Sequence, residues 1–303
     1  MRRVKDGSFL TCWCAAAAGR MMLTNSGMCL LAGDIRRYGG SRLDGAEARQ
    51  AEIRALVRDI TRCTELEAVL DGRASTCREV AGWQGLTRAA RWYVPEPWAG
   101  HIGAAAILFV SSNPSAGPRE EQFDPARHMS RRDRDEDLFT AADGAFDDPR
   151  FPGIASGLYN RDRRGRQVGA AVPFWRWTCG IARELLGREP APGNDYALTE
   201  VVHCGSQRET GVAAALGTCA SRYLRRVLAV SPAGVVVVVG ATARGVFEGS
   251  FGPNSPAACS TRRAVSGSGG AANCSVGPAT SSPCRTPTRA CPRTAWPGTS
   301  GRS

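Results

Sequence analysis

Five consecutive valines at positions 235–239, bounded by Gly234 and Gly240, constrain the fold more than any other feature of this sequence. An unbroken run of β-branched residues is typical of a strand that is buried on both faces, as in a parallel sheet covered by helices. A second apolar run at 106–110 and the segment "YALTEVVHC" at 196–204 predict two partner strands.

Amphipathic segments separate these strands. Apolar residues recur at helical spacing over residues 49–70, with a break expected near Cys63, and again over 174–186 and 210–230. Strands that alternate with helices are typical of a layered α/β domain. We therefore predict a three-layer α/β/α domain with a short central parallel sheet over residues 49–250.

Three other segments lack this pattern. Residues 1–48 show no convincing periodicity, and we expect a disordered, irregular extension there. Residues 116–170 are charged and glycine-rich, which indicates a solvated insertion or, alternatively, a loop that contacts substrate. Residues 251–303 form a low-complexity tail without the apolar content that an ordered core requires.

The net charge of +11 is unevenly distributed. Residues 254–303 contain six arginines and no Asp, Glu or Lys, so the remaining 253 residues carry only +5. A body this weakly basic is compatible with nucleic acid but does not by itself indicate it. No run approaches 18 apolar residues, so we expect no membrane partner and a cytoplasmic location.

A turn of small polar residues, "SSNPS" at 111–115, ends the strand at 106–110. The carboxyl ends of parallel strands are where α/β proteins build their sites. The neutral amide of Asn113 can donate and accept at once, which suits it to holding a water molecule. The alternative is a turn residue that only satisfies neighbouring backbone groups.

Five segments, in this order, resemble the uracil-DNA glycosylase superfamily, especially its iron–sulfur branches and its mismatch-specific branch. The resemblance spans residues 94–248. The segments are the strand that enters "SSNPS", the "PF" that opens the helix at 174–186, "VVHC", the helix with Cys219 followed by Tyr-Leu, and the valine strand followed by "GATA".

The resemblance implies roles for individual residues. Asn113 would orient the water that attacks the sugar C1′, and Ser112, Pro114 and Ser115 would complete that substrate-binding motif. Phe174 would stack on a base flipped out of the duplex, a contact worth about 1–3 kcal/mol. A phenylalanine that only fills the core is the alternative.

Glu200 occupies the position at which the family has an asparagine that reads the uracil edge. An ionised carboxylate only accepts hydrogen bonds, whereas an amide also donates. A charged Glu200 would therefore suit an exocyclic amine or a protonated ring nitrogen better than uracil.

The chain has twelve cysteines and no CxxC motif. Cys204 and Cys219 fall on two of the four ligand positions for the 4Fe–4S cluster of the iron–sulfur branches. The other two ligands come from an N-terminal CxxC in those branches; here Cys63 is followed by Leu66, and Cys77 is the nearest substitute. A 4Fe–4S cluster on these thiolates is one prediction, and buried free cysteines are the alternative.

Together these features predict a monomeric DNA glycosylase that hydrolyses the N-glycosidic bond of uracil or another deaminated base in base-excision repair. A non-catalytic pseudoenzyme that binds lesions or other nucleic acid is the second hypothesis. An unrelated nucleotide-binding α/β enzyme is disfavoured because the sequence lacks a GxGxxG or Walker-type loop.

One part of the family's site is missing. A His-Pro-Ser or His-Pro-Asn loop follows the last strand in the family, but the three histidines here, at 101, 128 and 203, all precede the valine run. With suitable codons, residues 284–290 read one base earlier give Leu-Pro-His-Pro-Asn-Ala-Arg. We therefore hypothesise that residues 251–303 are out of frame and that the chain as printed is catalytically impaired.

Resequencing the coding DNA across codons 240–303 tests this hypothesis. We expect a single-base change near codons 251–260 that restores a His-Pro-Asn loop. A confirmed frame would contradict the hypothesis and would favour the pseudoenzyme.

Overall fold

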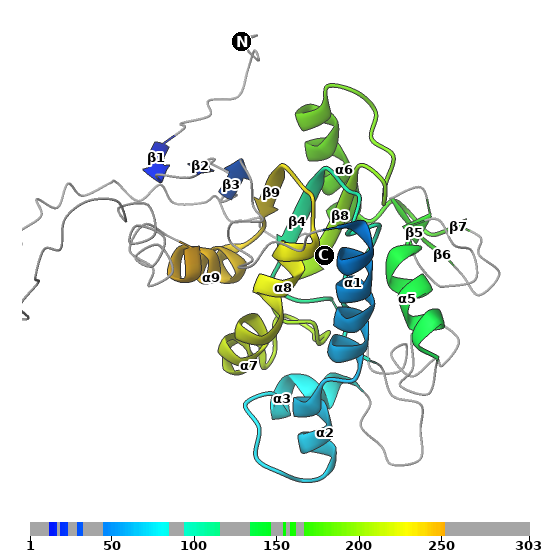
Figure 1. Ribbon diagram of the computed structural model, residues 1–303, viewed down its shortest axis with the longest axis vertical. Coiled ribbons are helices and arrows are strands. Elements are labelled where there is room, and N and C mark those ends of the chain that lie inside the picture. The colour runs from blue at the N-terminus through cyan, green and yellow to red at the C-terminus, as the bar shows by residue number, and fades with distance from the viewer. Residues whose placement is uncertain are drawn as a thin grey trace, which may run out of the picture.

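The computed structural model describes residues 12–16, 19–23, 29–32, 45–84, 94–115, 134–146, 154–155, 158–161 and 167–251. Its centre is a short parallel sheet in which β4 (Ile107–Ser111) lies between β8 (Tyr196–Glu200) and β9 (Val235–Val238) (Figure 1). The predicted α/β fold with a central parallel sheet is confirmed.

The central strand is buried on both faces. Phe109 of β4 pairs with Leu198 on one side and Val237 on the other, and all three are buried. Their side chains pack with α6 (Pro173–Leu186), whereas the neighbouring Leu108 and Val110 pack toward the opposite face. This alternation on a wholly apolar strand is why the sequence shows no period of two.

Helices cover both faces of this sheet. α1 (Ala46–Thr61) and α8 (Arg225–Val230) contribute to the larger core on the face opposite α6, and α9 (Ala241–Phe251) contacts β4 and β9. The shorter helices α2 (Thr64–Leu70), α3 (Arg78–Ala81) and α7 (Val212–Cys219) lie at the lower end of the molecule in Figure 1.

Two predicted helices depart from a regular α-helix near cysteines. The break expected near Cys63 is confirmed, because α1 ends at Thr61 and α2 begins at Thr64. The helix expected over 210–230 is continuous from Val212 to Val230, but a π-helical turn η3 (Ala220–Leu224) lies between α7 and α8. π-helical turns are rare and occur frequently at functional sites.

The structure adds strands that the sequence analysis did not predict. β1 (Cys12–Ala16), β2 (Gly19–Leu23) and β3 (Cys29–Ala32) form an antiparallel extension of the sheet within the segment expected to be irregular. β3 pairs antiparallel with β9. Strands of four or five residues are too short to show a clear period, and their pairing depends on a distant partner.

The charged insertion at 116–170 also contains regular structure. It includes α5 (Asp135–Asp143), which contacts α1, and a small sheet of β5 (Ile154–Ala155), β6 (Tyr159–Arg161) and β7 (Gln167–Val168). The segment is therefore more than the solvated loop that its composition indicated.

Within the described ranges, none of the helices combines the length and the apolar character needed to cross a lipid bilayer. The low-complexity tail and its hypothesised frame change lie outside the described residues from position 252 onward.

Replacing Phe109 by Ala tests the sheet as the centre of the fold. Phe109 is fully buried and contacts Tyr196 and Trp177 edge-on, with ring centroids 5.7 and 6.3 Å apart. We expect the free energy of unfolding, measured in urea, to fall by about 3–5 kcal/mol. The control is Leu185→Ala, because Leu185 is 40% exposed and its truncation should change stability by about 0.5 kcal/mol or less. Equal losses in both variants would contradict this assignment.

Candidate functional site

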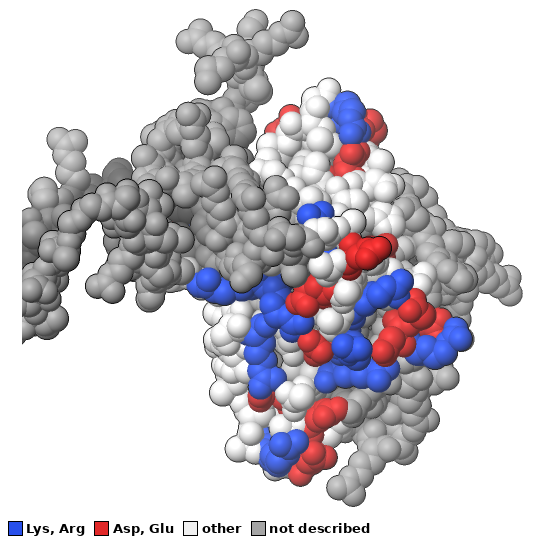
Figure 2. All heavy atoms as spheres, in the orientation of Figure 1, with Lys and Arg blue, Asp and Glu red and all other residues white. Residues whose placement is uncertain are grey.

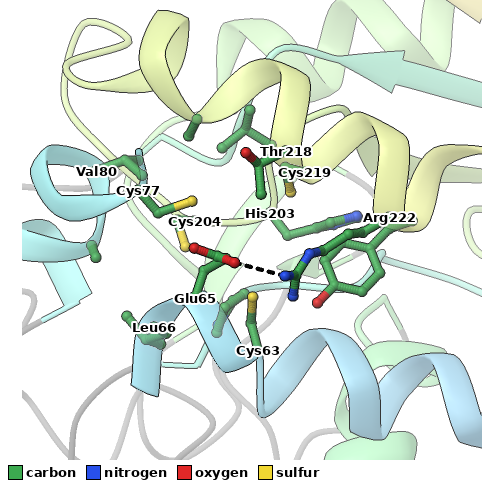
Figure 3. Close-up of a pocket in the computed structure, with 15 residues that line it drawn as sticks. Cys63, Glu65, Leu66, Cys77, Val80, His203, Cys204, Thr218, Cys219 and Arg222 are labelled. Atoms are coloured by element: carbon green, nitrogen blue, oxygen red, sulfur yellow. Dashed lines mark hydrogen bonds and ion pairs between the residues drawn. The ribbon is translucent and has the colours of Figure 1, made fainter. Parts of the chain in front are cut away.

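The four cysteines singled out from the sequence line one cavity. Cys63, Cys77, Cys204 and Cys219 are buried, carry free thiols and surround the space between α2, α3 and α7 (Figure 3). They come from four separate segments of the chain. In the sequence, no CxxC or other spacing motif relates Cys63 and Cys77 to each other or to the other two cysteines.

Two of these cysteines are helix caps. Cys63 precedes α2 and its carbonyl accepts from the Glu67 amide, and Cys77 precedes α3 and its carbonyl accepts from the Ala81 amide. Cys219 is the last residue of α7, directly before the π-helical turn. Cys204 lies in the segment that follows β8.

The close approach of two segments brings α3 and α7 together. Gly211 precedes α7 with φ of +77°, and a Cβ at this position would clash with the Val80 backbone nitrogen of α3. Only glycine combines this backbone conformation with so little space. Gly211 therefore permits the packing that brings the cysteines of α3 and α7 to a common cavity.

The cavity is lined mainly by apolar groups. Its enclosed space is small, with room for about one water molecule, and it widens toward solvent at its mouth. The apolar members of the wall are Leu66, Val80, Ala81, Pro95, Val202 and Ala215. Polar side chains, among them Glu65, Thr218 and Arg222, also contribute to the wall.

Burial favours the protonated thiol at Cys77, Cys204 and Cys219. It raises the pKa of Cys204 well above the ordinary thiol range, and it raises the pKa of Cys219 to about 12, partly offset by a hydrogen bond to the His203 backbone. Burial also raises the pKa of Cys77. Because metal binds the thiolate form, any metal at this site must displace these protons as it binds.

The electrostatic coupling among the cysteines indicates that they are close to one another, since Cys63 and Cys77 each raise the pKa of both Cys204 and Cys219. Among the residues that the structure describes, however, no three His, Cys, Asp or Glu side chains form a group that could hold a single metal ion.

His203 forms part of the cavity wall and is neutral. Burial lowers its pKa to about 4. Its Nδ1 donates to the Glu96 carbonyl at 2.8 Å, and the Glu96 amide donates back to the His203 carbonyl at 2.8 Å. The ring also contacts Tyr223 edge-on, with centroids 5.6 Å apart. These contacts fix the segment that carries Cys204.

Asn113 lies at the carboxyl end of β4 and bridges to the segment that follows β8. Its Nδ2 donates to the Pro114 carbonyl at 2.9 Å, to the Ser206 hydroxyl at 3.0 Å and to the Cys204 carbonyl at 3.3 Å. The amide nitrogen is thus committed to protein acceptors. Oδ1 receives one long contact, from the Ser112 hydroxyl at 3.5 Å, and retains capacity to accept a hydrogen from water.

The other residues of "SSNPS" lie at the same sheet edge. The Val202 amide donates to the Ser112 carbonyl, and the Ser206 amide donates to the Pro114 carbonyl. Ser115 continues this parallel pairing with Ser206. The structure therefore brings the predicted Asn113 motif together with the chain around Cys204.

Phe174 is the second residue of α6 and is half-buried. Its ring meets Trp175 edge-on at 5.3 Å and stacks on Trp177 at 6.2 Å with an interplanar angle of 29°. It also packs against the smaller hydrophobic core that includes Phe109 and Tyr196. The core-packing alternative is therefore supported for at least one face of the ring.

Glu200 ends β8 and pairs with Ser111 of β4. It is 6% exposed, and burial raises the pKa of its carboxyl well above the ordinary value, with a further contribution from Glu96. The sequence analysis treated Glu200 as ionised, whereas burial favours its protonated form. A protonated carboxyl donates as well as accepts, so it resembles the family's amide more than a carboxylate does.

Several residues of the site were not identified from the sequence. Thr218, Arg222 and Tyr223 line the cavity with Cys219. Arg222 and Tyr223 follow Cys219 by three and four residues, the spacing of one helix face, and this was the available signal. Glu96 lies between two prolines, and its backbone groups hold His203, but the sequence carries no signal for that contact.

Comparison with known proteins gives no match: none was found among protein-family models, curated proteins or solved structures.

The buried carboxyl of Glu200 makes stability depend on pH. An acid whose pKa is raised by folding binds its proton more tightly in the folded state, so its burial costs increasing stability as the pH rises above its unfolded value. Glu200→Gln removes this cost. We expect the variant to gain stability relative to the parent protein between pH 5 and pH 8 in urea unfolding, by about 1.4 kcal/mol per pH unit at most.

Glu184→Gln is the matched control, because Glu184 is an exposed acid on α6. Its stability difference from the parent should be nearly the same at both pH values. A pH-independent difference for Glu200→Gln would show that Glu200 is not titrating in this range.

Proposed function

We propose that this protein is a uracil-DNA glycosylase-like protein that binds DNA with a damaged base and holds a 4Fe–4S cluster. The convergence of Cys63, Cys77, Cys204 and Cys219 on one cavity carries the proposal. Cys204 and Cys219 follow the family's pattern, and Cys63 and Cys77 take the place of the missing CxxC.

The proposed group is a 4Fe–4S cluster rather than a single ion because Cys204 and Cys219 follow the pattern of the family's cluster ligands. Four cysteine thiolates are the usual ligands of such a cluster, and four line this cavity. When bound, it would cross-link the four segments that carry the cysteines.

The sheet edge supports the proposed hydrolysis. Asn113, with its Nδ2 committed to Pro114, Cys204 and Ser206, would use Oδ1 to orient a water toward C1′. The water oxygen would bond to C1′ as the C1′–N bond breaks, and the water would lose one proton to solvent. The bonding electrons would leave on the base, and the resulting base anion would take up a proton from solvent. Stabilising this developing negative charge is the largest requirement of the reaction.

A neutral Glu200 would support recognition of a deaminated base. Such bases present a carbonyl acceptor beside a ring N–H donor, and a protonated carboxyl offers the complementary donor and acceptor. The high pKa and the position of Glu200 beside Ser111 favour this interpretation over recognition of an exocyclic amine.

Anaerobic purification tests the cluster. We expect a brown protein with broad visible absorbance and about four irons per chain, because all four cysteines would act as thiolate ligands. Cys204→Ser and Cys219→Ser should each lose at least half of the iron. Cys179→Ser is the control, since Cys179 is a buried free cysteine on α6 away from the cavity.

Two results would contradict the cluster. A folded wild-type protein that remains colourless after anaerobic purification and after reconstitution with iron and sulfide would contradict it. So would equal iron loss in the Cys179→Ser and Cys204→Ser variants.

Binding to DNA tests the proposed substrate class. Fluorescence anisotropy should show at least about tenfold tighter binding to a duplex with one uracil or one abasic site than to the undamaged duplex, a difference of about 1.4 kcal/mol. Equal affinity for all three duplexes would contradict the proposal.

Base release distinguishes the enzyme from the pseudoenzyme. The chain as printed should release uracil at least about 100-fold more slowly than a version with the His-Pro-Asn loop restored, which is the cost of losing one positioned charge-stabilising group. Lesion binding without release in both versions would favour the pseudoenzyme.

A further inference from the structure

A polar network lies across the mouth of the cysteine cavity. The Arg222 guanidinium donates through Nη1 to the Thr64 hydroxyl at 2.6 Å and through Nη2 to Glu65 Oε1 at 2.6 Å. Figure 3 shows the contact between Arg222 and Glu65 beside the cysteines. It joins the π-helical turn to α2, which are more than 150 residues apart in sequence.

The network continues to Cys77. Glu65 Oε2 accepts from the Ser75 hydroxyl at 2.8 Å, and the oxygen of that hydroxyl accepts from the Cys77 amide at 3.0 Å. A second connection, between the Thr76 and Thr218 hydroxyls at 3.0 Å, joins the loop before α3 directly to α7. Both connections hold the loop before α3 against the helix that carries Cys219.

Each member of the network lies next to a cysteine in sequence. Thr64 and Glu65 follow Cys63, Ser75 and Thr76 precede Cys77, and Thr218 and Arg222 flank Cys219. The network therefore fixes three of the four cysteine-bearing segments relative to one another. Cys204 is held separately, through the backbone contacts of His203 with Glu96.

We propose that Arg222, held by Thr64 and Glu65, acts as a latch that closes the cysteine cavity and positions Cys63 and Cys77 relative to Cys204 and Cys219. Arg222 and Glu65 are 39% and 21% exposed, so the ion pair lies at the solvent boundary of the cavity. A pair this exposed contributes little to global stability. Its principal effect is on access to the thiols and on their relative positions.

The charge of Arg222 suits this position. When the thiols lose their protons to bind iron, negative charge accumulates in a largely apolar cavity, and a guanidinium at its mouth offsets part of that charge. The planar guanidinium also donates to Thr64 and Glu65 at the same time, which the single ammonium of lysine does less well.

The first test uses the full chain in its reduced, metal-free form. Thiol modification by a disulfide reagent is followed over time, and mass spectrometry of the labelled peptides identifies the cysteines. In Arg222→Ala, the reagent should label Cys63 and Cys77 at least about fivefold faster than in the wild type. This ratio of rates corresponds to the loss of about 1 kcal/mol of ion-pair energy. The labelling rate of Cys179, outside the cavity, should not change.

Arg226→Ala is the matched control. Arg226 lies four residues further on and makes two ion pairs, with Glu52 at 2.7 Å and Asp59 at 2.8 Å, but it does not line the cavity. Its loss should leave the labelling of Cys63 and Cys77 unchanged. Arg222→Lys should give an intermediate rate, and the exchange Glu65→Arg with Arg222→Glu should restore slow labelling.

Two outcomes would overturn the latch. Labelling of Arg222→Ala at the wild-type rate would overturn it, and so would an equal acceleration in Arg226→Ala. Thermal unfolding of each variant identifies global destabilisation, which would accelerate Cys179 as well as the cavity thiols and would also overturn the proposal.

The latch also has a consequence for the proposed cluster. The thiol-labelling measurement does not depend on the proposed function, whereas the following measurement does. In protein loaded with the cluster, iron loss to a chelator should be at least about fivefold faster for Arg222→Ala than for the wild type or Arg226→Ala. Equal iron loss in all three would overturn the latch as a positioning device for the cluster. A wild-type protein that takes up no iron would instead refute the cluster, while the thiol measurement still tests the latch.

Discussion

Cys204 joins the two halves of the candidate site, and the rest of the arrangement depends on how it is held. Its sulfur faces the cysteine cavity, while its carbonyl accepts a hydrogen bond from Nδ2 of Asn113. The segment reaches this position because β8 is buried beside β4, so that the amides of Val201 and Val202 pair with the carbonyls of Ser111 and Ser112. A shift of one residue in this register would move Cys204 away from both partners.

The valine strand makes this register possible. β9 pairs with β4 on the side opposite β8, and the helices on the two faces exclude water from all three strands. The polar residues Ser111, Asn113 and Glu200 then appear where the strands end. The apolar residues that stabilise the sheet thus occupy the middle of each strand, and the polar residues available for chemistry lie at its carboxyl end, as in other parallel α/β folds.

The charged surface has a different role. The face shown in Figure 2 carries arginines interspersed with acids rather than a continuous basic patch. Several arginines form ion pairs that join α1 to its neighbours, as Arg54 does with Glu136 of α5 and Arg226 of α8 does with Glu52. These ion pairs support helix packing, and the DNA contacts of the proposed function would belong to the sheet edge around Asn113.

The elements that the sequence predicted are those with long, local signals. The valine run, the helix over 174–186 and the break at Cys63 all follow from patterns within about 20 residues. The strands β1, β2 and β3 could not be predicted in this way, because β3 depends on pairing with β9, about 200 residues away.

In the candidate site too, residues with a local sequence signal were predicted and contacts between distant segments were not. Cys204 and Cys219 were found through the order of motifs, whereas the contact between Arg222 and Glu65 joins segments 157 residues apart and has no local signature. The protonated state of Glu200 was also missed, because burial depends on tertiary packing rather than on the residue type.

A crystal structure of the anaerobically purified protein, with anomalous scattering recorded at the iron edge, tests the central claim most directly. The account predicts one strong anomalous peak enclosed by the sulfurs of Cys63, Cys77, Cys204 and Cys219, with Arg222 closing the cavity beside it. Four free thiols around a space without iron, or iron held by other cysteines, would contradict it.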